Sequence, residues 1–143
     1  MRQYWTILGI GPWGIYTYAP PKLRETTVRG RPEPYSMKLA LARVGSIVFE
    51  LIQPLQGNSI YKEFLLQKGE GLHHIASHAV QDLAVAMAEL KRRGIGELQC
   101  GKYVDGDFEA AYAYMDTEKP LGAILELVKL RDGKRPPPEE TYP

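Results

Sequence analysis

The residue types best suited to chemistry are two adjacent histidines and two glutamates in apolar surroundings. His73 and His74 open an apolar, strand-like segment, whereas Glu50 and Glu126 each lie inside a run of aliphatic residues. An unpaired carboxylate is costly to bury, so such a group needs a cation or hydrogen-bond partners. Imidazole and carboxylate groups are common ligands of divalent ions. One imidazole and two carboxylates in apolar strands therefore indicate a metal site. The alternatives are a histidine satisfied in the core or at the surface and glutamates that reach the rim of the sheet.

The elements that must position these side chains follow from hydrophobic periodicity. Three helical segments are expected, at residues 1–8, 58–68 and 83–93, and Asp82 can cap the last of them. Strands are expected at residues 13–18, 36–44, 46–53, 71–80, 97–104, 108–115 and 122–130. The connection 19–34, rich in Pro, Arg and Thr, is expected to be a functional or mobile loop. Within it, Arg29 and Arg31 either meet an anionic substrate group or are simply solvated. Tyr112 and Tyr114 share one strand face, as packing residues or as a pocket wall.

The order of elements suggests an internal duplication. From residue 71 onward it is β-α-β-β-β, and before that it is a helix end followed by three strands, the same unit without its first strand. Glu50 and Glu126 stand at matching points of the last strand in each half. We therefore predict an α+β fold built from two such units. The expected divisions are 1–57 for the incomplete first module, 58–70 for a linking helix, 71–131 for the complete second module and 132–143 for a disordered tail.

Five stretches in this order carry a resemblance to a known family: 8–13 (LGIGPW), 34–37 (PYSM), 49–55 (FELIQPL), 69–76 (GEGLHHIA) and 114–122 (YMDTEKPLG). The chain resembles the vicinal oxygen chelate superfamily, which includes glyoxalases, bleomycin-resistance proteins and extradiol dioxygenases. The most similar branch is the methylmalonyl-CoA epimerase-like proteins. The resemblance implies duplicated β-α-β-β-β modules that form a curved mixed sheet around a metal cleft.

The resemblance also implies the metal ligands Glu50, His74 and Glu126. His74 matches because the family's ligand directly precedes the Ile-Ala of its strand, which leaves His73 as a packing residue or an outer partner of the site. His78 lies about 13 Å along the strand from His74, given a rise of about 3.3 Å per residue. It is too far away to bind the same ion, but it could line the same pocket.

The family's fourth ligand is a histidine on the first strand of the first module, and this strand is absent from the sequence. Met1 falls where a residue inside a helix is expected. We therefore expect either a start codon assigned too late or a natural truncation. Three protein ligands would remain, and the sheet would have an unpaired edge that a partner subunit could fill.

The activity that the resemblance implies is that of a metal-dependent isomerase or lyase. Imidazole and carboxylate ligands suit Co, Mn, Ni, Zn or Mg. Glu126 would be the catalytic carboxylate, moving a proton next to a carbonyl of an acyl-CoA or another substrate with vicinal oxygens. The alternatives are a non-catalytic small-molecule binding protein, of the kind that confers resistance, and an inactive truncated member.

Composition and local sequence patterns argue against several other classes of function. The 143 residues are 44% hydrophobic with a net charge of +1, which predicts one globular domain. The basic cluster at residues 91–93 ends a helix and does not indicate nucleic-acid binding. Residues 9–14 match a dinucleotide-binding G-x-G-x-x-G pattern but lack the required strand before it and helix after it. We therefore expect no organic cofactor and no membrane segment, and a cytoplasmic homodimer that acts on a small molecule.

Overall fold

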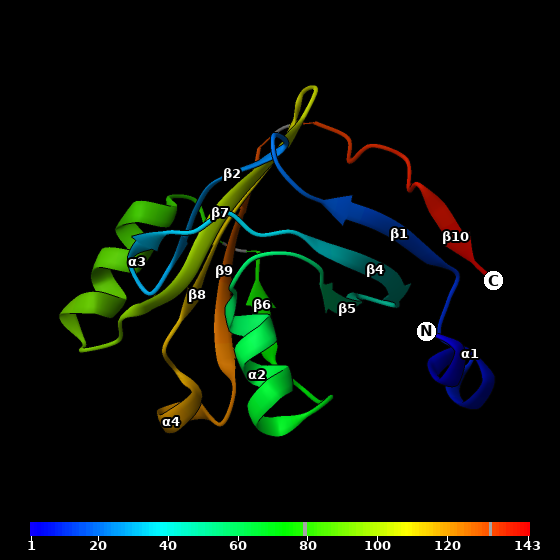
Figure 1. Cartoon of the computed structure of the whole chain (residues 1–143), viewed down its shortest axis with the longest axis horizontal. Helices are drawn as coiled ribbons and strands as arrows, with labels where there is room; N and C mark the ends of the chain where they lie inside the picture. The colour runs from blue at the N-terminus through cyan, green and yellow to red at the C-terminus, as the bar shows by residue number, and fades with distance from the viewer. Residues whose placement is uncertain (79, 132) are drawn as a thin grey trace.

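The computed structural model describes residues 1–78, 80–131 and 133–143. Within these residues the chain forms two sheets, with strand orders β10-β1-β4-β5 and β3-β2-β7-β8-β9-β6 (Figure 1). The helices are α1 (Arg2–Leu8), α2 (Ile60–Lys68), α3 (Leu83–Arg92) and α4 (Glu118–Leu121). The strands are β1 (Trp13–Tyr18), β2 (Leu23–Val28), β3 (Arg31–Pro32), β4 (Met37–Val44), β5 (Ile47–Pro54), β6 (His74–Ser77), β7 (Glu97–Asp105), β8 (Phe108–Met115), β9 (Ile124–Leu130) and β10 (Glu140–Tyr142). The predicted α+β class is confirmed.

The second half of the chain forms the predicted β-α-β-β-β unit, β6-α3-β7-β8-β9. Strand β6 runs parallel to β9, whereas β7, β8 and β9 pair in antiparallel fashion, so the sheet is mixed. Helix α3 covers the outer face of this sheet through its apolar stripe, which packs on Ala113, Met115 and Leu127. Asp82 caps the helix, as predicted, by accepting a hydrogen bond from the backbone N–H of Val85 at 3.0 Å.

The first half contains α1, β1, β4 and β5, in the order predicted for the incomplete unit. Strand β5 pairs with β4 over its whole length and is the last strand of its sheet. Among the described residues no strand pairs with the other edge of β5. The opposite edge of this sheet is covered, because β10 pairs with β1.

The segment 19–34, expected as a loop, instead contains two strands. Strand β2 pairs with β7 and so extends the second sheet, and a tight turn leads from β2 into β3. The turn residues Arg29 and Gly30 both have positive φ, 51° and 74°, as a two-residue hairpin turn requires. The sequence prediction was wrong here because β2 is mostly polar, and its partner β7 lies far away along the chain.

The C-terminal tail is also more ordered than predicted. Residues Glu140–Tyr142 form β10, and the two carboxylate oxygens of Glu139 accept hydrogen bonds from the backbone N–H and hydroxyl of Thr17, at 2.9 and 2.8 Å. Arg135 lies over the rings of Tyr16 and Phe108. The prediction of disorder failed because the tail gains backbone pairing along an open sheet edge, which its polar composition did not reveal. Asp132, in the same predicted tail, lies outside the described residues.

The strand expected at 71–80 is shorter in the structure, β6 covering His74–Ser77. Ala79, within the predicted range, lies outside the described residues. The predicted alternation of β9 is confirmed: Ile124 and Val128 belong to the core between the sheets, whereas Leu127 packs on the outer side under α3. In the part of the chain described, no helix has the length and hydrophobicity needed to cross a bilayer.

Candidate metal centre

Three side chains from three strands meet between the two sheets. Glu50 comes from β5, His74 from β6 and Glu126 from β9, and each offers a ligand atom within 4.8 Å of the others. Nε2 of His74 lies 3.3 Å from Oε1 of Glu50 and 3.5 Å from Oε2 of Glu126. The structure thus brings together the three residues that the sequence singled out, although they are far apart along the chain.

Strand register explains this convergence. Ala76 of β6 pairs with Glu126 of β9, so His74, two residues earlier, shares a sheet face with Glu126. On β5, Glu50 pairs with Leu41 of β4, and the next pair on that face is Ile52 with Leu39, which is part of the core between the sheets. Because side chains two residues apart on a strand point the same way, each of the three groups faces inward.

The three groups differ in burial, and their ionisation reflects it. The side chains of Glu126 and His74 are 9% and 10% exposed, whereas that of Glu50 is 27% exposed. Burial, together with the nearby charge of Glu50, raises the pKa of Glu126 to about 8. Burial lowers the pKa of His74, but its contact with Glu50 and the charge of Glu126 outweigh this effect, and the net shift is upward. Without a cation the cluster therefore tends to hold protons.

The cluster has a donor set and spacing that fit a divalent ion. Ligands about 2.1 Å from a shared ion lie roughly 3.0–3.4 Å apart in octahedral or tetrahedral geometry. The distances from His74 to the two glutamates, 3.3 and 3.5 Å, are close to this range. A cation would also neutralise the repulsion between Glu50 and Glu126 that raises the pKa of the buried carboxyl. The residues present therefore fit a bound ion.

A network of buried tyrosines lies behind the cluster. Tyr114 stands directly opposite Glu126 in the β8–β9 pair, and a side-chain hydrogen bond from Tyr114 lowers the pKa of that glutamate. The hydroxyl of Tyr61 donates to that of Tyr114 at 2.9 Å. Tyr112 and Tyr35 form a second hydroxyl pair at 2.5 Å. The sequence does not distinguish packing from a pocket wall for Tyr112 and Tyr114; their alternation along β8 is the local signal of this network.

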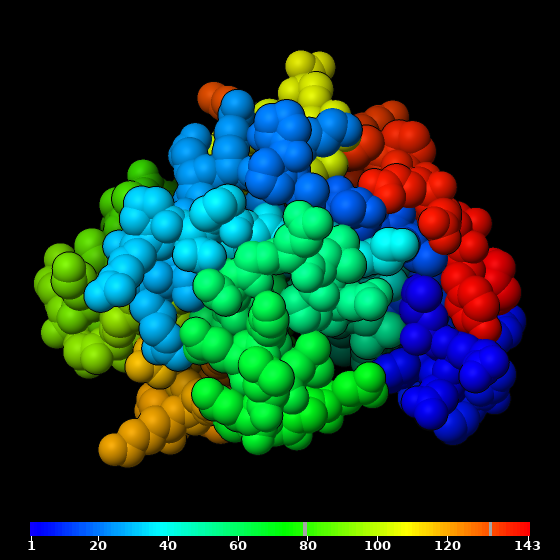
Figure 2. Space-filling model, in the orientation of Figure 1, coloured from blue at the N-terminus to red at the C-terminus, as the bar shows by residue number. Residues whose placement is uncertain are grey.

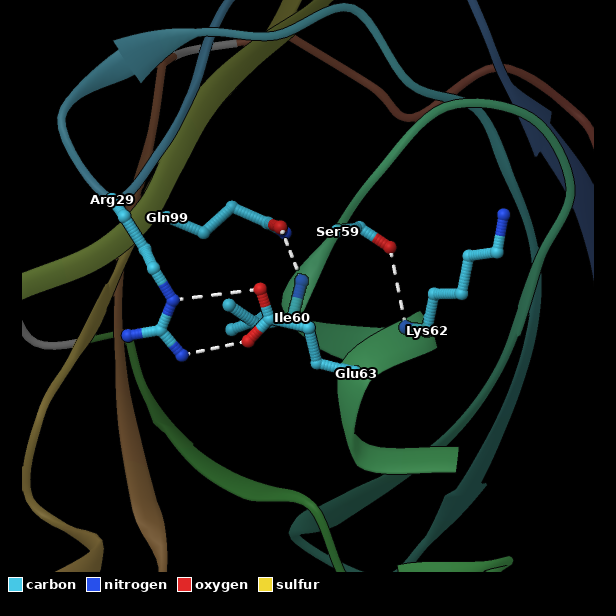
Figure 3. A network of polar contacts seen from close by, with 6 residues as sticks. All are labelled: Arg29, Ser59, Ile60, Lys62, Glu63 and Gln99. Atoms are coloured by element: carbon cyan, nitrogen blue, oxygen red, sulfur yellow. Dashed lines mark hydrogen bonds and ion pairs between the residues drawn. The ribbon is translucent and has the colours of Figure 1, made fainter. Parts of the chain in front are cut away.

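Polar contacts anchor the start of α2, the helix that carries Tyr61 (Figure 3). Ser59 caps the helix by accepting from the N–H of Lys62 at 3.3 Å, and the side chain of Gln99 accepts from the N–H of Ile60 at 3.0 Å. The guanidinium of Arg29 pairs with both carboxylate oxygens of Glu63, at 2.6 and 3.4 Å. Arg29 therefore pairs with a carboxylate of the same chain, and this hydrogen bond raises the pKa of its guanidinium.

His73 and His78 differ in their relation to the cluster. Nδ1 of His73 lies 3.1 Å from Nδ1 of His74, and the His73 ring packs against Tyr61, Phe64 and Tyr114. Burial and the neighbouring His74 lower the pKa of His73 to about 4, so the ring is neutral near pH 7. His78 is exposed just beyond the end of β6 and is not part of the ligand cluster.

Residues of α2 occupy the lower centre of the face shown in Figure 2, and Tyr61 and Phe64 of this helix pack against His73, next to the cluster. A concavity of about 420 Å³ lies elsewhere, lined by residues of 20–26 and 32–34. A second, of about 180 Å³, is lined by Met1, Ile15 and residues of β4 and β5. Neither is lined by Glu50, His74 or Glu126. Within the cluster, Glu50 is the most exposed member.

The chain matches a known protein family over most of its length. A sequence profile of the Glyoxalase/Bleomycin resistance protein/Dioxygenase superfamily matches residues 1–114. The chain belongs to this superfamily. The matched region contains Glu50 and His74 and ends before Glu126. A curated relative, the uncharacterized protein YqjC of Bacillus subtilis (strain 168), is 46% identical over 44 residues, which are 31% of this chain and 31% of that protein. The match thus spans less than a third of that relative.

Solved structures of other proteins share the fold. The hypothetical protein BH1468 from Bacillus halodurans C-125 superposes with a TM-score of 0.61 at 21% identity, covering 94% of this chain and 86% of that one. A methylmalonyl-CoA epimerase bound to methylmalonyl-CoA and NH4+ has a TM-score of 0.61 at 19% identity, covering 94% and 87%. A single-residue variant of Streptomyces coelicolor methylmalonyl-CoA epimerase, bound to 2-nitronate-propionyl-CoA, gives the same values. At this identity the likeness shows the fold alone.

Proposed function

We propose that this protein is a divalent-metal-dependent isomerase or lyase that transfers a proton on a carbon next to a carbonyl. The observation that carries the proposal is the cluster of Glu50, His74 and Glu126, in which one imidazole and two carboxylates lie within ligand distance of one another. Superfamily membership supports it. A cation would also offset the cost of burying the charge of Glu126, which lies beside a second carboxylate, Glu50.

Glu50, Nε2 of His74 and Glu126 would hold the ion. When bound, the ion supplies positive charge to a substrate carbonyl oxygen that becomes negative as a proton leaves the neighbouring carbon. Three protein ligands leave coordination positions for water or for two neighbouring oxygens of a substrate. Tyr114 and the core around it exclude water from the inner side of the cluster.

Glu126 is the residue we assign to proton transfer. Its carboxylate is almost fully buried beside His74, where the ion would bind. A bound ion opposes the rise in pKa seen in the metal-free cluster, so the assignment depends on the position of Glu126 rather than on that pKa. The Tyr114 side chain, directly across the strand pair, orients the carboxylate. The same group that contacts the ion can therefore also accept and return a proton.

For the substrate class, we favour an acyl-CoA thioester or another molecule with vicinal oxygens. Two of the solved structures with the same fold are epimerases bound to acyl-CoA ligands, which supports this class by analogy of fold. Epimerisation of an acyl-CoA at its α-carbon is the reaction of this kind that the proposed chemistry performs most directly. A protein that only binds such molecules would share the cluster but would not exchange the α-proton.

Metal content tests the first part of the proposal. The parent protein, stripped with a chelator and reconstituted, should bind about one divalent ion per chain, and H74A and E126A should lose it. The matched control is Glu70→Ala, an exposed carboxylate four residues before His74 that lies outside the cluster. Absence of stoichiometric metal in the parent protein would refute a metal-dependent activity.

Solvent deuterium exchange tests the second part. The metal-loaded protein should introduce deuterium from D₂O at the α-carbon of an accepted acyl-CoA, measured by mass spectrometry. E126Q keeps a carbonyl oxygen as a ligand but cannot hold the proton, so it should retain metal with weaker affinity and lose exchange. Thermal stabilisation by the ligand without any exchange would instead indicate the non-catalytic binding protein.

A further inference from the structure

The two adjacent histidines at the start of β6 contact one another through the same ring nitrogen. Nδ1 of His73 and Nδ1 of His74 are 3.1 Å apart, and the rings stand at 78° to one another. A hydrogen bond of this kind needs one nitrogen with a proton and one without. The contact therefore has a direction, and that direction decides which nitrogen of His74 is free.

The other nitrogen of His74 fixes the direction. Nε2 points at Glu50 and Glu126, at 3.3 and 3.5 Å, so it is the nitrogen that would bind an ion. A neutral imidazole carries only one proton, and a nitrogen that binds a metal must present its lone pair. The proton of His74 must then be on Nδ1, where it is donated to Nδ1 of His73.

Packing holds the plane of the His73 ring, and the contact with His74 favours the ring orientation that accepts this proton. Three aromatic rings surround it, with centroids of Tyr61 at 5.4 Å, Phe64 at 5.1 Å and Tyr114 at 5.9 Å. Rotation of the ring by half a turn would replace Nδ1 with a carbon atom opposite His74. The remaining nitrogen, Nε2, is buried near the backbone of Ile60 and makes no hydrogen bond of ordinary geometry. The close polar contact of the His73 ring is therefore the one with His74.

We propose that His73 is a positioning residue that accepts the Nδ1 proton of His74 and so selects the tautomer whose Nε2 can bind an ion. The inference rests on the proposed metal-dependent function, and it adds a role to a residue outside the ligand set. Metal-binding histidines commonly donate their second N–H to an outer partner, usually a carboxylate or a carbonyl, and loss of the partner typically costs about 10–100-fold in metal affinity. Here a second imidazole takes that place.

Two variants separate the acceptor role from packing. H73F keeps an aromatic ring among its three neighbours but removes the acceptor, whereas H73N places an amide oxygen near the position of Nδ1. Competition with a chelator should show H73F binding Zn²⁺ about 10–100-fold more weakly than the parent protein, and H73N recovering most of the loss. The thermal stability of the metal-free proteins, measured in parallel, reports on packing and on the His73–His74 contact without the metal, and its changes should not account for the loss of Zn²⁺ affinity.

Nitrogen NMR of the parent protein gives a second, independent readout. In the Zn²⁺-loaded protein, long-range ¹H–¹⁵N spectra should show His74 protonated at Nδ1 and His73 protonated only at Nε2. A proton on Nδ1 of His73, or equal Zn²⁺ affinity in all three proteins, would overturn the inference and leave the metal-dependent function intact. A parent protein that binds no Zn²⁺ or other divalent ion would overturn both together.

Discussion

Oε1 of Glu50 lies 3.3 Å from Nε2 of His74, although the two residues belong to different sheets. Each stands on the last strand of its own sheet, β5 and β6, so backbone pairing within the described residues does not link them. The contact between the two sheets at this point is made by side chains of the candidate metal centre. Because no strand pairing supports this contact, we expect it to depend on the charges of the side chains that make it.

The first prediction concerns this contact. Glu50→Gln keeps the shape of the side chain but removes its charge, so the ion loses one of two carboxylates. Divalent-metal affinity, measured by isothermal titration, should fall by more than the roughly 10–100-fold typical of outer partners. The control is Glu70→Gln, which changes an exposed carboxylate outside the cluster and should leave the affinity unchanged. Equal effects of both substitutions would show that Glu50 acts only through net charge.

The second prediction concerns the tyrosine behind the site. Tyr114→Phe leaves the ring but removes the hydroxyl, so Glu126 loses a partner that lowers its pKa, and Tyr61 loses its acceptor. Urea denaturation should show a loss of about 1–3 kcal/mol in the free energy of unfolding. Metal affinity at pH 7 should fall as well, because the ion must displace a more tightly held proton.

Tyr112→Phe is the matched control for Tyr114→Phe. Its hydroxyl is similarly buried but pairs with Tyr35, and Tyr112 pairs across the sheet with Val128 rather than with Glu126. We expect a comparable loss of stability with little change in metal affinity. If both variants weakened metal binding to the same extent, the tyrosine network would act through general packing.

The third prediction concerns pH. Glu126 holds its proton up to about pH 8 in the folded, metal-free protein, but the unfolded chain loses it near its ordinary value of 4.5. Between these values the folded state binds the extra proton, so the free energy of unfolding falls as pH rises. His74 acts in the same direction, because its pKa is also raised.

Melting temperature measured with a chelator present checks this prediction. It should decrease from pH 6.5 to pH 8. Each extra proton bound by the folded state lowers the free energy of unfolding by at most about 1.4 kcal/mol per pH unit. The window starts at 6.5 because His73, with its lowered pKa, opposes the trend only below its ordinary value. Glu126→Gln should reduce the slope, and saturating metal should abolish or reverse it. A melting temperature that rises across this window would contradict the assigned ionisation of Glu126.

The fourth prediction concerns the C-terminal segment. Arg135 lies 4.9 Å from the ring centroid of Phe108 and 5.5 Å from that of Tyr16, and it donates to the hydroxyl of Tyr18. Arg135→Ala should destabilise the protein by about 1–2 kcal/mol, through the lost cation–π contacts and hydrogen bond. Lys134→Ala removes a neighbouring exposed charge and should cost almost nothing. Proteolysis should also cleave the tail of the Arg135 variant faster, if this side chain holds it on the sheet.

Local pattern was sufficient for much of the fold. The helix predicted at 58–68, which is Ile60–Lys68 in the structure, and the helix capped by Asp82 depend largely on interactions within a few residues. The strand around Glu126 alternates clearly, so the periodicity of all three was visible in the sequence. The candidate ligands were also identifiable, because charged residues inside apolar strands are rare without a reason. The choice of His74 over His73 came from family resemblance, since periodicity alone does not tell one adjacent histidine from the other.

The pattern of residues thus indicates the two similar halves, the main helices and strands, the two glutamates and the adjacent histidine pair, and family resemblance then selects His74. Only the tertiary structure decided that β2 joins the second sheet, that the tail forms β10, and that Tyr114 lies across from Glu126. These features depend on pairing between segments far apart in the chain, such as Thr17 with Glu139, and polar edge strands carry little local signal. The same is true of the protonation of Glu126 and His74, because burial and neighbouring charge exist only once both sheets have assembled.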